Sequence, residues 1–138
     1  MEKIGQILIK EGYINQATLE EAQNLQRELN LPLGKVLIEM KKITDEQFAK
    51  ALSIQLKIPY CQPLNMNLDP ELLAILTPRQ AEKYRVIPIQ VEDGRLTLAT
   101  AEPLNLEILD HLRGVLDYKI KFAIASESQI NGALNKFY

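Results

Sequence analysis

The sequence predicts an α+β fold: an N-terminal helical lobe of two repeated helix-turn-helix units, followed by a small α/β sandwich with a three-stranded or slightly larger mixed sheet. Two observations predict it. Before residue 57 the apolar residues recur at helical spacing, and the pattern occurs twice. After residue 57 the spacing changes, and alternating apolar residues on both sides of Asp93-Gly94 indicate a β-hairpin. We therefore divide the domain into two lobes, residues 1–57 and residues 58–138.

The repeat aligns residues 3–26 with residues 32–55 without a gap, at a constant offset of 29 (34 − 5 and 55 − 26). Six of the 24 aligned positions are identical, which indicates an internal duplication. The identical pairs are Gly5 and Gly34, Leu8 and Leu37, Ile9 and Ile38, Ile14 and Ile43, Ala22 and Ala51, and Gln26 and Gln55.

Each copy is predicted to form a short helix, a tight turn and a longer helix. Gly12 suits a left-handed residue that ends the first helix, and Asn15 can cap the next one. In the second copy Thr44 and Gln47 form a capping box. Because Lys41 takes the place of the turn glycine, we expect the second turn to differ slightly in shape.

Two pairs of repeated residues have two interpretations each. Gln26 and Gln55 lie on the inward-facing stripe of the longer helices, where an amide either contacts a ligand or reaches solvent or a backbone carbonyl near the helix end. Gly5 and Gly34 lie near the start of the short helices, where a missing side chain permits either a close helix–helix contact or the approach of an anion.

The first copy resembles the MshEN motif, which binds cyclic di-GMP in bacterial type II secretion and type IV pilus-assembly ATPases. The residues that carry the resemblance are Lys3-Ile4-Gly5, Leu8, Gly12 and Gln26, and the copies are separated by five residues, 27–31, as in the family. The resemblance implies that each copy holds one half of the dinucleotide. The first and last residues of each motif would make polar contacts with the ligand. The aliphatic residues of the motif would cover its base and ribose. The ligand-binding residues carried over are Lys3, Ile4, Gly5, Leu8, Gly12 and Gln26 in the first copy and Leu33, Gly34, Leu37 and Gln55 in the second.

Both copies depart from the family at the opening arginine, which is Lys3 in the first copy and Pro32 in the second. Lysine keeps the charge but loses the planar fork, and proline offers no side-chain donor. We therefore expect weak binding of cyclic di-GMP that favours the half-site of the first copy.

The second lobe is predicted from turn and cap signals, and it is similar to the rest of the N-terminal domain of type II secretion ATPases. Asp69-Pro70 and Thr77 with Gln80 begin short helices, and Ser126 with Gln129 forms a third capping box. In the first strand, at 86–92, we expect Ile87, Ile89 and Val91 on one face, with Pro88 confining this strand to an edge. A helix at 105–113 and a strand containing Ile120, Phe122 and Ile124 follow, and the final helix begins after the third box.

The composition excludes several functional classes. A formal charge of −2 argues against DNA or RNA binding, and no apolar stretch is long enough for membrane insertion. The sequence contains no G-x-x-x-x-G-K-[ST] phosphate loop and only one histidine and one cysteine, so we expect no enzymatic activity, no metal and no cofactor.

The predicted function is that of a non-catalytic regulatory module of a secretion or pilus-assembly ATPase system, with cyclic di-GMP as candidate ligand. The alternative is a docking module that binds an inner-membrane platform protein without a ligand. The expected partners are thus cyclic di-GMP, a downstream ATPase domain or the platform protein. We expect a cytoplasmic location, or one peripheral to the inner membrane through a partner.

Overall fold

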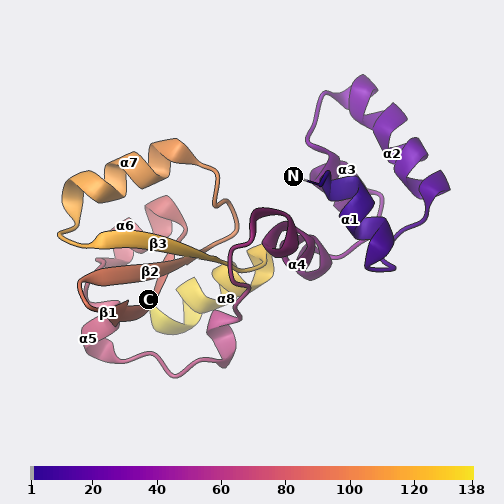
Figure 1. Ribbon diagram of the computed structural model, residues 1–138. Coiled ribbons are helices and arrows are strands. Elements are labelled where there is room, and N and C mark those ends of the chain that lie inside the picture. Colours follow the sequence, from indigo (N-terminus) through magenta and orange to yellow (C-terminus); the bar gives the residue numbers. More distant parts are fainter. Residues whose placement is uncertain (1) are drawn as a thin grey trace. The chain divides into compact units, whose positions relative to one another are not determined.

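The computed structural model describes residues 2–138, which form two compact units, one ending at Lys57 and the other beginning at Ile58 (Figure 1). The α+β class and the three-stranded mixed sheet are confirmed. Within the described residues, no helix has both the length and the apolar character needed to cross a membrane.

The first unit consists of four helices, whose starts keep the offset of 29 that the sequence shows. They are α1 (Ile4–Lys10), α2 (Gln16–Leu29), α3 (Leu33–Glu39) and α4 (Asp45–Leu56). Both short helices have seven residues, whereas α4 is shorter than α2 at its C-terminal end. The duplication in the sequence is therefore a duplication of structure.

The turns between the helices are built from local hydrogen bonds. The Asn15 side chain accepts a hydrogen bond from the Thr18 backbone N–H, and Thr44 with Gln47 forms the full capping box, so both predicted caps are confirmed. Gly12 has φ +79°, as expected for a left-handed residue.

Our expectation that Lys41 changes the shape of the second turn is wrong. Lys41 has φ +59°, in the same left-handed region as Gly12, and its N–H donates to Ile38 just as the Gly12 N–H donates to Ile9. The backbone bonds of this turn hold the lysine in a conformation that costs roughly 1 kcal/mol for a residue with a Cβ.

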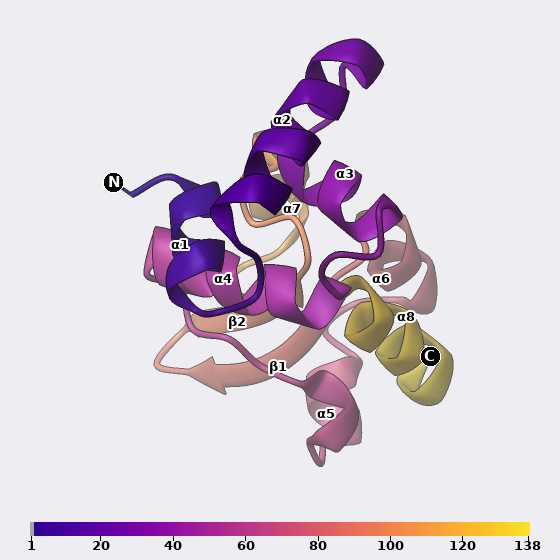
Figure 2. The ribbon, with the colours of Figure 1, turned by 90° about the vertical axis from the view of Figure 1, so that its right-hand side faces the viewer.

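The two copies pack across each other. Helix α1 lies mainly beside α4, and α2 mainly beside α3, so the main backbone neighbour of each short helix is the long helix of the other copy (Figure 2). The side chains of Leu19 and Phe48 also reach the short helix of their own copy. One continuous core results, in which buried residues of both copies meet. Its members are Ile7, Leu8, Ile14, Leu19, Ala22, Val36, Leu37, Ile43 and Ala51.

The second unit is a three-stranded sheet with helices on both faces. Its strands are β1 (Ile87–Glu92), β2 (Arg95–Thr100) and β3 (Lys119–Ile124), in the order β1-β2-β3. β1 and β2 form the predicted antiparallel hairpin, and α7 (Leu106–Val115) connects β2 to the parallel β3. The other helices are η1 (Pro63–Asn65), α5 (Pro70–Leu73), α6 (Pro78–Tyr84) and α8 (Glu127–Phe137).

Each face of this sheet has its own core. Leu96 and Leu98 of β2 pack with residues of α6 and α7, whereas Ala99, on the opposite face, packs with Ile130 and Ala133 of α8. Figure 1 shows α8 in front of the sheet and α6 behind it. Pro88 lies on an edge strand, as expected.

The prediction that Ile87, Ile89 and Val91 share one face is wrong. The register shifts between Pro88 and Gln90, so one residue is inserted and the alternation reverses after it. Ile87 is opposite Ala99, on the α8 side, whereas Val91 is opposite Leu96 and is 41% exposed.

The caps of the second unit follow the predictions only in part. Pro70 is at the first position of α5 as expected, but the Asp69 side chain makes no capping hydrogen bond. Thr77 and Gln80 form a capping box. Ser126 accepts from the Gln129 N–H as expected, but the Gln129 side chain accepts from Leu64 N–H at 3.0 Å and so ties η1 to α8. Tyr138 similarly joins α8 to α5, because its hydroxyl donates to the Leu73 carbonyl at 2.7 Å.

Candidate ligand-binding site

The swapped packing of the repeat creates a hollow of about 320 Å³ on the helical unit. It is lined by the first turn of α1, one side of α2, the start of α3 and the end of α4. The lining residues are Lys3, Ile4, Gly5, Gln6, Leu19, Gln23, Gln26, Leu33 and Gln55. Both copies of the repeat therefore contribute to one site.

Six of the ten residues expected from the sequence line this hollow. They are Lys3, Ile4, Gly5, Gln26, Leu33 and Gln55. Although Gln26 and Gln55 are far apart in the chain, the structure brings them to the same hollow, where both are partly exposed. The Gln55 side-chain amide donates to the Glu2 backbone carbonyl at 3.2 Å, which was the alternative interpretation of an amide near a helix end.

The other four expected residues lie elsewhere. Leu8 and Leu37 are completely buried in the core of the helical unit. Gly12 occupies the turn after α1, where a side chain would meet no neighbouring atom within 4 Å. Gly34 is buried beneath the ring of Phe48.

The repeated glycines both permit close helix contacts, which was one of their two interpretations. A Cβ on Gly5 would lie 2.7 Å from Leu19 Cδ1, and a Cβ on Gly34 would lie 2.8 Å from Phe48 Cδ1 and closer still to two other ring atoms. Gly5 in addition lines the hollow, whereas Phe48 covers Gly34. Most of the lining of the hollow thus comes from the first copy.

Sequence reasoning missed Gln6 and Gln23, which also line the hollow. Gln23 lies three residues before Gln26 on α2, and this spacing places both amides on one side of the helix. That spacing is the signal that could have identified Gln23. Gln6 lies in the first turn of α1 next to Lys3 and carries no comparable signal.

The lining combines one cation, four side-chain amides and three aliphatic residues, and it contains no carboxylate. Each amide offers two donors and an acceptor, so the hollow can match a ligand with hydrogen-bonding edges. Ile4, Leu19 and Leu33 supply apolar surface, and Lys3 supplies a positive charge for an anion.

Other candidate reactive groups lie outside the hollow. Cys61 has a pKa raised to about 11 because it is largely buried, so it is neutral near pH 7. His111 lies edge-on to Tyr84, with ring centroids 6.1 Å apart. Within residues 2–138, no group of His, Cys, Asp or Glu side chains is placed to hold a metal ion.

The chain belongs to the MshEN domain family, whose model matches residues 56–138. The matched residues are those of the α/β unit, whereas the motif on which we based the resemblance lies in residues 3–55. The family is therefore shown independently of the repeated motif.

Two curated relatives are type IV pilus assembly ATPases named PilB. The protein of Myxococcus xanthus is 26% identical over 99% of this chain, and that of Thermus thermophilus is 31% identical over 99% of it. The matched regions make up only 24% and 19% of these relatives, so the chain spans a quarter of their length or less.

Among solved structures, that of MshE with cdg (cyclic di-GMP) is similar over the whole of both chains, with 27% identity and a TM-score of 0.83. The N-terminal domain of XpsE also matches 100% of this chain and 99% of that one, at 19% identity and a TM-score of 0.72, which shows a common fold. Both helical and α/β units thus have counterparts in these proteins.

Proposed function

We propose that this chain is a non-catalytic regulatory module of a secretion or pilus-assembly ATPase system, and that its helical unit binds cyclic di-GMP. The observation that carries the proposal is the hollow in which Lys3, Gln26 and Gln55 meet, since these opening and closing residues of the motif come from both copies. The similarity to MshE, whose structure contains cyclic di-GMP, supports the same ligand.

The chemistry of the hollow suits this ligand. A guanine edge presents both donors and acceptors, which the amides of Gln23, Gln26 and Gln55 can match. The flat face of a base and the carbon edge of a ribose would pack against Ile4 and Leu33. Lys3 is the one charged group in the lining and would contact a phosphate.

The two half-sites are expected to contribute unequally. The second copy has Pro32 in place of the opening cation, and its Gly34 is covered by Phe48. A lost charge-assisted contact typically costs about 1.5–3 kcal/mol, roughly a ten- to hundredfold loss of affinity. The proposal therefore predicts weak binding dominated by the first copy.

The alternative function is protein docking without a ligand, and the two missing arginines favour it. In this case the module would hold an inner-membrane platform protein. In both cases the ATPase activity would reside in a further domain of a longer protein, and the module would lie in the cytoplasm or on the inner membrane through its partner. The small share of the PilB relatives that this chain matches is consistent with such an arrangement.

Calorimetric titration of the chain with cyclic di-GMP tests the proposal. We expect saturable binding that is weakened by Gln26→Ala and unchanged by Gln16→Ala, a matched control because Gln16 is exposed, donates to Glu20 and does not line the hollow. GMP should bind more weakly, since it provides only half of the contacts. A dissociation constant of 1 mM corresponds to a binding free energy of roughly −4 kcal/mol. If no binding is detected at about 1 mM ligand, the ligand proposal fails and the docking function remains.

A further inference from the structure

Helix α8 covers only one half of the sheet face on which it packs. Ile87 and Ala99 pack beneath α8, but the rows nearer the hairpin turn carry polar residues on the same face. In these rows Arg95 is opposite Lys119, and Thr97 is opposite Lys121. The three basic side chains are exposed.

A surface hollow of about 520 Å³ adjoins these rows, and its lining contains four basic residues and no carboxylate. The lining residues are Arg95, Arg113, Tyr118, Lys119, Ile120 and Lys121. No ion pair neutralises any of the four cations in the part of the chain that the structure describes. This concentration of positive charge contrasts with the formal charge of −2 for the whole chain.

The arrangement is unfavourable for the isolated module. Arg95 and Lys119 are register partners on neighbouring strands, and Lys121 lies two residues further along the same face. Like charges directly opposite each other destabilise a sheet. An anionic partner would remove this repulsion on binding.

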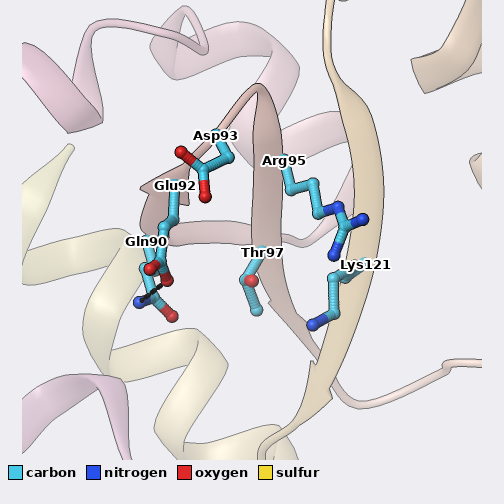
Figure 3. Close-up of a pocket in the computed structure, with 6 residues that line it drawn as sticks. All are labelled: Gln90, Glu92, Asp93, Arg95, Thr97 and Lys121. Atoms are coloured by element: carbon cyan, nitrogen blue, oxygen red, sulfur yellow. Dashed lines mark hydrogen bonds between the residues drawn. The ribbon is translucent and has the colours of Figure 1, made fainter.

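Two carboxylates close to these cations restrict the kind of anionic partner that can bind. Figure 3 shows Arg95 and Lys121 next to each other on the β2–β3 side, with Glu92 and Asp93 on the β1 side. A broad anionic surface such as a membrane would bring negative charges over these two acids as well, and the repulsion would oppose binding. A narrow acidic chain can follow the cations alone.

We propose that Arg95, Arg113, Lys119 and Lys121 form a docking surface for an extended acidic segment of a partner protein. Alternate side chains of an extended segment point in opposite directions. Its acids would contact Arg95, Lys119 and Lys121, which share one face of the sheet. An intervening apolar side chain would pack on Ile120 and Tyr118, which are partly buried on the opposite face, that of α7 and Arg113. This proposal is independent of cyclic di-GMP binding, since it concerns the other unit.

Fluorescence anisotropy with a defined probe tests the docking surface. The probe is a fluorescein-labelled peptide of about twelve alternating glutamate and valine residues, which spans about 40 Å when extended. The test variant is Arg95→Glu/Lys119→Glu. The matched control is Lys42→Glu/Arg79→Glu, which makes the same charge change at two exposed residues outside the hollow.

We expect the test variant to lose about tenfold or more in affinity and the control to change less than about threefold, with binding weakened by added salt. The single variant Lys119→Glu should bind the probe more weakly although it removes the like-charge pair and so raises Tm, which separates binding from folding. Equal losses in the test and control variants, or no binding by the parent chain, would overturn the proposal. So would tighter binding to phosphatidylglycerol vesicles than to the peptide.

Discussion

At the residue scale, Gly34 shows how one missing side chain fixes a helix contact. The Phe48 ring lies so close to the Gly34 backbone that a Cβ cannot fit without moving it. Gly34→Ala should therefore lower the free energy of unfolding by about 1–3 kcal/mol, as overpacking does. Chemical denaturation monitored by circular dichroism measures this change.

Gly114→Ala is the matched control for that substitution. Gly114 lies in α7, and a Cβ there would meet no neighbouring atom within 4 Å. Since alanine is the better helix former, this variant should be more stable by roughly 0.5–1 kcal/mol. If both alanines had the same effect, close packing at Gly34 would not be the reason for its glycine.

Lys3 and Pro32 occupy equivalent positions at the start of α1 and α3, and they test the role of the missing arginines. Lys3→Arg should strengthen cyclic di-GMP binding modestly, because the charge is already present and only the planar fork is gained. Pro32→Arg should give a larger gain, up to about tenfold, because it adds a donor and a charge. The readout is the dissociation constant from titration. A parent chain and two arginine variants that all fail to bind would contradict the ligand proposal.

Local residue roles could be predicted from the sequence because their cause is local. Asn15, Thr44 and Thr77 cap helices through bonds to residues three positions away. The role of Gly34 could not be decided in this way. It depends on Phe48, fourteen residues later, lying on top of it, and the spacing in the sequence is equally compatible with an anion site.

At the scale of elements, β3 carries a charge arrangement that should cost stability. Lys119 is opposite Arg95, and Arg95 is in turn opposite Glu92 on β1. Lys119→Glu would replace repulsion by attraction, so we expect the free energy of unfolding to rise by about 0.2–1 kcal/mol at low salt. The gain should shrink as salt screens these exposed charges.

Lys121→Glu is the control on the same strand, since its register partner is the uncharged Thr97. It should change the stability less than Lys119→Glu does. Thermal melts of both variants at low and high salt provide the comparison. A destabilised Lys119→Glu variant would show that the two like charges do not repel measurably.

The hairpin and the helices could be predicted as elements, but some of their side-chain directions could not. The Asp93-Gly94 turn and the alternating apolar residues specify β1 and β2. Pro88 is compatible with an edge strand or with a bulge, so the sequence does not predict the single inserted residue near Ile89, which reverses the side-chain directions that follow it. Likewise Gln129 caps no backbone group of its own helix, because Leu64 from a distant segment offers a donor.

At the scale of the whole molecule, the sequence does not determine which short helix of the repeat packs with which long helix. Near-identical copies present near-identical apolar faces, so each short helix could pack with the long helix of its own copy or of the other. In the structure the helix backbones pair mainly in the second way, with α1 beside α4 and α2 beside α3, while Leu19 and Phe48 also pack on the short helix of their own copy. This pairing also creates the candidate site, because it brings the end of α4 next to the start of α1, where Gln55 reaches Glu2.

Swapped pairing predicts that one copy alone has no complete core. A fragment of residues 1–31 would expose Leu8 and Leu19, which are buried in a core shared with the second copy, and isolated helices of this length are marginal in water. We expect residues 1–57 to unfold cooperatively and residues 1–31 to be mostly unfolded when dilute.

At high concentration, two fragments of residues 1–31 can take the places of the two copies, so helicity should rise with concentration as a dimer forms. Circular dichroism with sedimentation measures both properties, and a mixture of residues 1–31 with residues 32–57 should regain helicity in the same way. A monomeric, stably helical fragment of residues 1–31 would contradict the requirement for a core shared by both copies.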